Sequence, residues 1–206
     1  MKEEELLFEL NKLENFTKKI NFLNDHLKRL SYGSARIVYI LDNSRVLKLA
    51  KNKKGLVQNR KEYDLYDNGN EILAKILRSD EKYFWIIVEK ADVINESEFE
   101  KITGLNYECY CDYLTYIRRK IDPRKYMNLG NKLDEIIITQ MINHTFVSKL
   151  VDFIKVSDID IKDLYKVSSY GLTYRENEEK IVLIDYGITN EIYFKYYKNY
   201  EKRLLR

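Results

Sequence analysis

The sequence predicts an α+β protein, with a β-rich part between an N-terminal helix and a mostly helical part. Two patterns predict this class. Between residues 35 and 88, short β-rich runs come in pairs around one helix-length segment, whereas beyond residue 96 apolar residues recur every three or four positions. Of the 206 residues, 45% are hydrophobic, which is ample for a packed core. We therefore expect a helical segment over residues 1–30, a β-rich lobe over 31–91 and a helical lobe over 92–206.

Leucines spaced for a helix dominate the first 30 residues, so this segment predicts an amphipathic helix that covers the core that follows. Its most favourable place for a break is Asn24–Asp25. The β-rich lobe then predicts two hairpins on either side of one helix. The expected elements are strands Ala35–Leu41 and Arg45–Ala50, helix Lys54–Asn68, and strands Ile72–Leu77 and Tyr83–Val88.

The second half predicts helices, a polar loop and one more hairpin before a last helix. These are helices Glu96–Ile102, Tyr107–Arg119 and Leu129–Lys155, loop Asp158–Ser169, strands Tyr170–Tyr174 and Ile181–Ile184 around the turn Arg175–Lys180, and a helix from Ile188 to Leu204.

Composition excludes several classes of function. The formal net charge is only +3, too weak to indicate nucleic-acid binding on charge alone. Basic clusters such as Lys51–Lys54 are more typical of a solvated face, so we expect no nucleic-acid partner. The start lacks the basic region of a signal peptide, and no apolar run approaches the ~20 residues of a membrane helix. These features predict a cytoplasmic protein without a membrane partner. Cys109 and Cys111 cannot fill a tetrahedral zinc site, so we expect them to be buried and reduced.

Two candidate residues for phosphate chemistry lie in the β-rich lobe. Strand residues alternate faces, so Lys48 points away from both of its leucine neighbours. It faces either solvent or a cleft, where it could bind a phosphate and a carboxylate. Glu62 in the next helix could supply that carboxylate. Before them, Gly33 and Ser34 open a hairpin, where a small residue lets backbone amides approach phosphate oxygens.

Two aspartates and a serine are the candidates in the second half. Asp163 lies in the polar loop and is followed by Ser168. Asp185 stands between an apolar strand and Gly187, where a carboxylate can project beyond the strand end and hold Mg²⁺.

In this order, the features resemble the protein-kinase-like superfamily over roughly residues 28–206. The resemblance implies a compact two-lobe fold with ATP between the lobes and Mg²⁺ as the metal. It implies a phosphate-covering loop at Gly33 and Ser34, a Lys48–Glu62 pair, and a hinge that binds adenine through its backbone at Glu89 and Ala91. It also implies that Asp163 is the base, that Asp185 binds the metal, and that Ser168 takes the second metal position. The segments GSARIVY, VLKLAKNKKGLVQN and SSYGLTYRENEEKIVLIDYG are similar to small kinase-like proteins of phages and prophages.

Departures from that pattern leave two functions open. The loop has one glycine, Ile161-Lys162 stands before Asp163, and no protein-substrate platform follows Gly187. One function is ATP- and Mg²⁺-dependent phosphotransfer by an atypical kinase to an unknown acceptor. The alternative is a pseudokinase that acts as a binding module, such as a phage-encoded inhibitor of a host defence protein. The enzyme implies a nucleotide and a substrate, and the binding module implies a protein partner, with or without a bound nucleotide.

Overall fold

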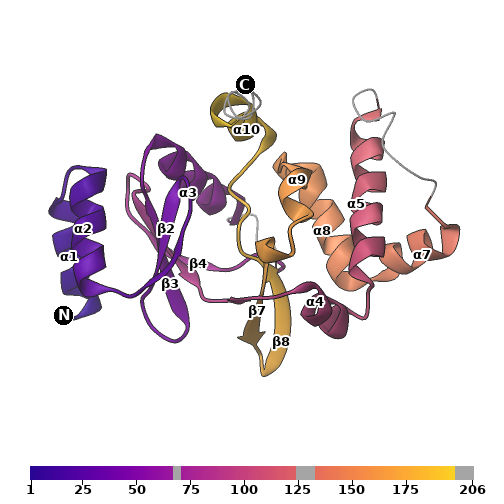
Figure 1. The fold of residues 1–206 in the computed structure, drawn as a ribbon, viewed down its shortest axis with the longest axis horizontal. Helices are drawn as coiled ribbons and strands as arrows, with labels where there is room; N and C mark the ends of the chain where they lie inside the picture. Colours follow the sequence, from indigo (N-terminus) through magenta and orange to yellow (C-terminus); the bar gives the residue numbers. More distant parts are fainter. Residues whose placement is uncertain (67–70, 124–132, 198–206) are drawn as a thin grey trace. The chain divides into compact units, whose positions relative to one another are not determined.

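The computed structural model describes residues 1–66, 71–123 and 133–197, which form two compact units (Figure 1). Unit 1 comprises residues 1–68, 74–90 and 194–206, and unit 2 comprises residues 69–73 and 91–193. Both units combine helices with an antiparallel sheet, so the predicted α+β class is confirmed.

Unit 1 begins with two helices, α1 (Glu3–Lys12) and α2 (Phe16–His26). The predicted break at Asn24–Asp25 is wrong, because the chain leaves the helical conformation at Leu13 instead. Asn15 then caps the new helix, since its side chain accepts the backbone N–H of Lys18 at 2.8 Å. This cap fixes where α2 begins.

The sheet of unit 1 has five antiparallel strands in the order β1-β2-β3-β5-β4. They are β1 (Arg29–Tyr32), β2 (Arg36–Ile40), β3 (Arg45–Ala50), β4 (Ile76–Ser79) and β5 (Trp85–Glu89). The sequence pattern missed β1, an edge strand whose four residues are all exposed and so show no alternation of apolar and polar positions. It also placed the fourth strand too early, since the structure begins it at Ile76.

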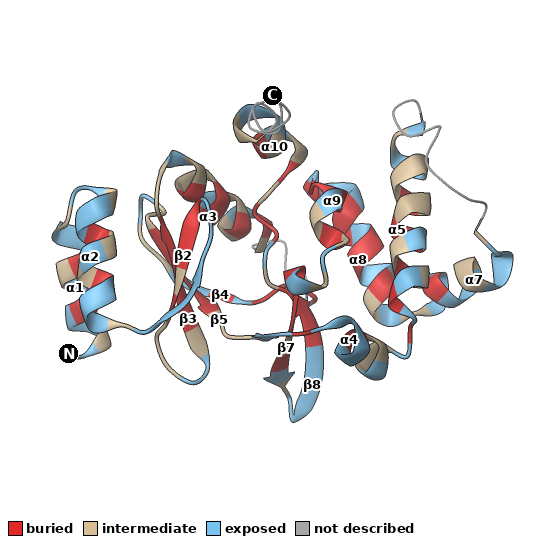
Figure 2. Ribbon diagram, viewed as in Figure 1, coloured by how far each residue is buried: buried red, intermediate tan, exposed pale blue. Residues whose placement is uncertain are grey.

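The two faces of this sheet carry different residues. Leu47 and Leu49 pair with residues of β2 and β5 that share their face, and α1 and α2 cover that face with leucines. Lys48 lies on the opposite face, where helix α3 (Lys53–Tyr66) reaches its backbone and side chain. Figure 2 shows the buried positions along β2, β3 and α3.

Unit 2 contains most of the remaining helices. They are α4 (Glu96–Thr103), α5 (Tyr107–Ile121), α7 (Glu135–Asn143), α8 (Thr145–Ser157), α9 (Ile161–Leu164), the 3-10 helix η1 (Val167–Ser169) and α10 (Asn190–Tyr196), whose last residues belong to unit 1. The single helix predicted over Leu129–Lys155 is wrong, because His144 adopts an extended conformation and separates α7 from α8. Residues 129–132, and the end of the predicted last helix beyond residue 197, lie outside the described residues.

A second antiparallel sheet in unit 2 has the strand order β6-β7-β8, with β6 at Asp92–Val93, β7 at Tyr170–Arg175 and β8 at Glu178–Leu183. The turn between β7 and β8 is tighter than predicted. It consists of Glu176 and Asn177, whose φ angles of 53° and 63° match a two-residue hairpin loop.

Two further expectations concern cysteines and membranes. Cys109 and Cys111 form no disulfide, but both are half-buried rather than buried. In the described part of the chain, no helix is long and apolar enough to cross a membrane.

Candidate functional site

The structure brings Lys48 and Glu62 together in unit 1. The Lys48 ammonium donates to Glu62 Oε2 at 2.7 Å, and the side chains are 7% and 0% exposed. Of the two orientations that the sequence allowed, Lys48 therefore takes the buried one, beneath α3. This ion pair connects β3 to the middle of α3, the helix that follows β3 in the sequence.

Arg36, which the sequence analysis did not single out, is the third member of this cluster. Its Nη1 donates to the other carboxylate oxygen, Oε1 of Glu62, at 2.7 Å, and its side chain is 9% exposed. Strand register explains its position, because Val38 pairs with Lys48 and Arg36 lies two residues before Val38 on the same face. The cluster thus holds two cations against one carboxylate.

Asn59 fastens α3 to the sheet next to this cluster. Its side-chain amide donates to the carbonyl oxygens of Lys48 at 3.3 Å and Tyr83 at 3.0 Å, and its oxygen lies 3.5 Å from Arg36 Nη1. Asn59 is fully buried, so these bonds replace the water that its polar atoms lose. The position of Glu62, one turn further along α3, is fixed as a result.

The cluster keeps Glu62 ionised. Burial alone would raise the pKa of this carboxyl group, but the charges of Arg36 and Lys48 and their hydrogen bonds outweigh burial, and the pKa lies below its ordinary value. An ionised Glu62 holds Lys48 in place.

Gly33 and Ser34 lie in an exposed turn of unit 1 between β1 and β2. The Gly33 N–H closes that turn by donating to the Arg36 carbonyl at 2.9 Å. Two side chains hold the turn from outside, because Lys51 donates to the Gly33 carbonyl at 2.9 Å and Asn52 to the Ser34 carbonyl at 3.1 Å. The turn is therefore tied to the residues that connect β3 to α3.

The predicted hinge residues lie where the chain leaves unit 1. Glu89 ends β5, and its N–H donates to the Lys75 carbonyl at 2.8 Å. Ala91 begins the second part of unit 2. It lies close to Gly171, where an added Cβ would meet the Ala91 Cβ at 2.8 Å.

Asp163 belongs to the short helix α9 of unit 2. Its carboxylate accepts from the Lys166 ammonium at 2.5 Å, and its side chain is 17% exposed. The Ser169 hydroxyl donates to the Asp163 backbone carbonyl at 2.6 Å and so fixes the turn below it. Ser168 is exposed in η1, and Lys166 is a partner that the sequence analysis did not foresee.

Asp185 is exposed directly after β8, and two backbone bonds align its segment with the Asp163 loop. Ile184 N–H donates to the Ser169 carbonyl at 2.8 Å, and Asp160 N–H donates to the Ile188 carbonyl at 3.0 Å. The two aspartates therefore lie in adjoining segments of unit 2.

The same segments are linked electrostatically through Lys166. The hydrogen bond that Lys166 donates to Asp163 raises the pKa of Lys166 despite partial burial, and the charges of Asp163, Asp185 and Asp160 act in the same direction. Mg²⁺ is commonly held by one or two carboxylates together with substrate phosphates and water, which two aspartates fit. In the described ranges, no group of three or more His, Cys, Asp and Glu residues is arranged to hold a metal by itself.

A network of buried tyrosines supports the Asp163 loop from below. Tyr170 donates to the Leu164 carbonyl at 2.9 Å, and its hydroxyl lies 2.6 Å from that of Tyr110 in α5. Tyr107 donates to the Tyr165 carbonyl at 3.1 Å. Burial raises the pKa of Tyr107 well above its ordinary value, so its hydroxyl keeps its proton at neutral pH, and these hydroxyls serve as donors that position the loop.

Comparisons with known proteins give similar solved structures alone. No protein-family model matches the chain, and no curated protein matches it. SAICAR synthase from Saccharomyces cerevisiae complexed with SAICAR has a TM-score of 0.40 and 10% identity, covering 78% of this chain and 73% of that one. The ternary complex of streptomycin, ATP and APH(2″)-IIa has a TM-score of 0.38 and 13% identity, covering 85% and 71%. A further SAICAR synthase structure has a TM-score of 0.37 and 10% identity, covering 80% and 74%.

Proposed function

We propose that this chain is a kinase-like protein that binds ATP with Mg²⁺ and transfers a phosphoryl group to an acceptor. The observation that carries the proposal is the buried cluster of Arg36, Lys48 and Glu62. Removing two cations and one carboxylate from water is expensive, and apolar residues of similar volume would often serve stability as well. A buried cluster of charged side chains at such a place is therefore a candidate functional site.

Each candidate residue has a distinct role in this proposal. Lys48 binds phosphate oxygens, with Arg36 as a second cation, while Glu62 orients both. Asp185 holds the metal, assisted by the hydroxyl of Ser168. Asp163, which accepts a hydrogen bond from Lys166, accepts the proton of the acceptor hydroxyl.

The remaining candidates would bind the nucleotide itself. Gly33 and Ser34 cover the phosphates, and the backbone at Glu89 and Ala91 binds the adenine. Mg²⁺–ATP supplies the phosphoryl group and neutralises charge when bound.

Thermal unfolding with and without ATP and Mg²⁺ tests the binding part. At a ligand concentration of 100 times Kd the stabilisation is about 2.7 kcal/mol. Each kcal/mol moves Tm by roughly 2–4 °C for a chain of this length, so saturation should raise Tm by about 5–11 °C. Lys48→Met and Asp185→Ala should abolish this shift. The control Lys53→Met, on an exposed residue of α3, should retain it. A shift that survives in Lys48→Met would contradict the proposal.

A second candidate function is a pseudokinase that binds a protein partner. Two observations favour it: the Gly33 N–H is already used within its own turn, and the Asp163 carboxylate is already paired with Lys166. The expectation that the chain is a phage-encoded, cytoplasmic inhibitor of a host defence protein belongs to this candidate. ADP formation that disappears in Asp163→Asn supports the enzyme. Nucleotide binding without any turnover supports the binding module.

A further inference from the structure

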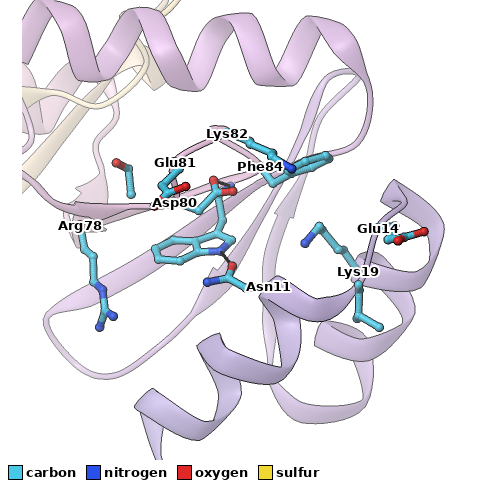
Figure 3. Close-up of a pocket in the computed structure, with 11 residues that line it drawn as sticks. Asn11, Glu14, Lys19, Arg78, Asp80, Glu81, Lys82 and Phe84 are labelled. Atoms are coloured by element: carbon cyan, nitrogen blue, oxygen red, sulfur yellow. Dashed lines mark hydrogen bonds between the residues drawn. The ribbon is translucent and has the colours of Figure 1, made fainter.

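A cavity of about 740 Å³ lies within unit 1, on the side of the sheet that faces away from Lys48. Its walls come from the α1–α2 connection, from Lys19 of α2, and from the turn between β4 and β5 (Figure 3). Trp85 of β5 forms part of the wall. The next residue, Ile86, points to the opposite face of the sheet, where it pairs with Lys48. The cavity is therefore separate from the cluster of Arg36, Lys48 and Glu62, and its size is that of a small-molecule site.

Lys19 is the unusual residue of this cavity. It is only 2% exposed, although a lysine is almost never fully buried without a partner. Among the described residues, only the Leu10 carbonyl oxygen accepts a hydrogen bond from its ammonium group, at 2.7 Å. An ammonium group has three donors, so two of them have no acceptor in the described part of the protein. Figure 3 shows the ammonium end pointing toward the side of the cavity where Asn11 and Asp80 lie.

The nearest acid does not neutralise Lys19. Asp80 is partly buried, which raises its pKa, and its carboxylate already accepts the Trp85 N–H at 3.1 Å and further backbone amides of its own turn. Burial lowers the pKa of Lys19, and the nearby charge of Lys82 lowers it further against the opposing charge of Asp80. Lys19 and Lys82 thus lie near each other and near Asp80, whose hydrogen-bonding capacity is largely used.

The rest of the lining limits which anion fits. The Phe84 ring lies 4.8 Å from the Lys19 ammonium and offers an apolar wall. Glu14 and Glu81 are exposed lining residues whose charges disfavour a multiply charged anion. We propose that this cavity binds a small organic carboxylate with one negative charge and an apolar body, the carboxylate accepting hydrogen bonds from Lys19 and the body lying against Phe84.

Trp85 makes the test direct, because it is the only tryptophan in the chain and lines the cavity. Its indole N–H donates to Asn11 at 2.8 Å, so a ligand that moves either group should change the fluorescence. The full chain is titrated with phenylacetate, with neutral 2-phenylethanol and with phenyl phosphate, which is a dianion at neutral pH. We expect saturable binding of phenylacetate, with an affinity at least about tenfold higher than that of 2-phenylethanol. The proposal is overturned if millimolar phenylacetate gives no saturable change in fluorescence, or if the alcohol binds with equal affinity. Tighter binding of phenyl phosphate overturns the choice of a monoanion.

Variants separate binding from the structural role of Lys19, which also contacts the end of α1. Lys19→Gln should weaken phenylacetate at least about tenfold, whereas the exposed neighbour Lys18→Gln should leave the affinity unchanged. If Lys19→Gln does not fold, the exposed Lys82→Gln decides instead, with an expected weakening of about two- to tenfold through loss of a nearby charge. Unchanged affinity in the folded Lys19→Gln, or in Lys82→Gln where that variant decides, overturns the proposal. Lys48→Met should bind phenylacetate like the wild type, so the result is independent of ATP binding.

Discussion

Replacing Glu62 with glutamine should destabilise unit 1 strongly. The carboxylate is fully buried and accepts from both Arg36 and Lys48 at 2.7 Å. Glutamine keeps the shape but removes the negative charge that both buried cations contact. Breaking a buried ion pair in this way costs about 3–5 kcal/mol. For a chain of this length the loss corresponds to a fall in Tm of about 6–20 °C.

Removing Lys48 should cost much less than removing Glu62, although both belong to the same ion pair. Lys48→Met leaves Glu62 its ion pair with Arg36, and the methionine fills most of the volume of the lysine stem. We expect a loss below about 2 kcal/mol. Asp64→Asn, on an exposed residue of α3 that pairs loosely with Arg60, is the matched control and should change stability by at most about 0.5 kcal/mol.

Urea unfolding followed by Trp85 fluorescence measures these differences, because Trp85 is buried in unit 1. Circular dichroism at the same urea concentrations reports the whole chain and shows whether unit 2 unfolds separately. Equal losses in Glu62→Gln and Lys48→Met, or a loss below about 1 kcal/mol in Glu62→Gln, would refute the argument that Arg36 shares the Glu62 carboxylate.

Three other predictions follow from single contacts. Because the pKa of Glu62 lies below its ordinary 4.5, its stabilising effect is complete above that pH and is lost as the pH falls through the lower pKa of the folded state. Urea unfolding at a series of pH values should show the difference in stability between wild type and Glu62→Gln shrinking in acid. A difference that stays constant in acid would contradict the shift. Gly55→Ala should destabilise by about 1–3 kcal/mol in spite of alanine's helix propensity, because its Cβ would clash with the Ala35 carbonyl oxygen. A variant that is stabilised in urea would show that the backbone can move to make room. Tyr170→Phe leaves the Leu164 carbonyl without its hydroxyl donor at 2.9 Å and should lower the free energy of unfolding by about 1–3 kcal/mol, measured by circular dichroism in urea. An unchanged midpoint would mean that the hydroxyl does not stabilise the fold.

The sequence predicted those strands that are rich in apolar residues. β2, β3 and β5 have buried residues that the pattern reveals, and the Asn15 cap could have been recognised from the asparagine itself. β1 could not be found in this way, since its side chains are exposed on both faces and only its hydrogen bonds to β2 define it. The helix predicted over residues 129–155 failed for a related reason, because an apolar stripe continues past His144 although the backbone does not.

The sequence predicted the candidate site only at residues whose context allows few structural roles. A lysine between leucines on a strand and a glutamate in the next helix suggest an ion pair, and the structure forms that pair. Arg36 falls within the predicted strand Ala35–Leu41, and nothing in the local sequence singles it out. Its contribution depends on register: Val38 pairs with Lys48, so Arg36 lies diagonally from Lys48 on the same face and reaches Glu62. A shift of β2 by one residue would move Arg36 to the face covered by α1 and α2 and leave Glu62 with one cation. The charge of the cluster is therefore decided by strand pairing, a long-range property that spacing along the chain does not contain.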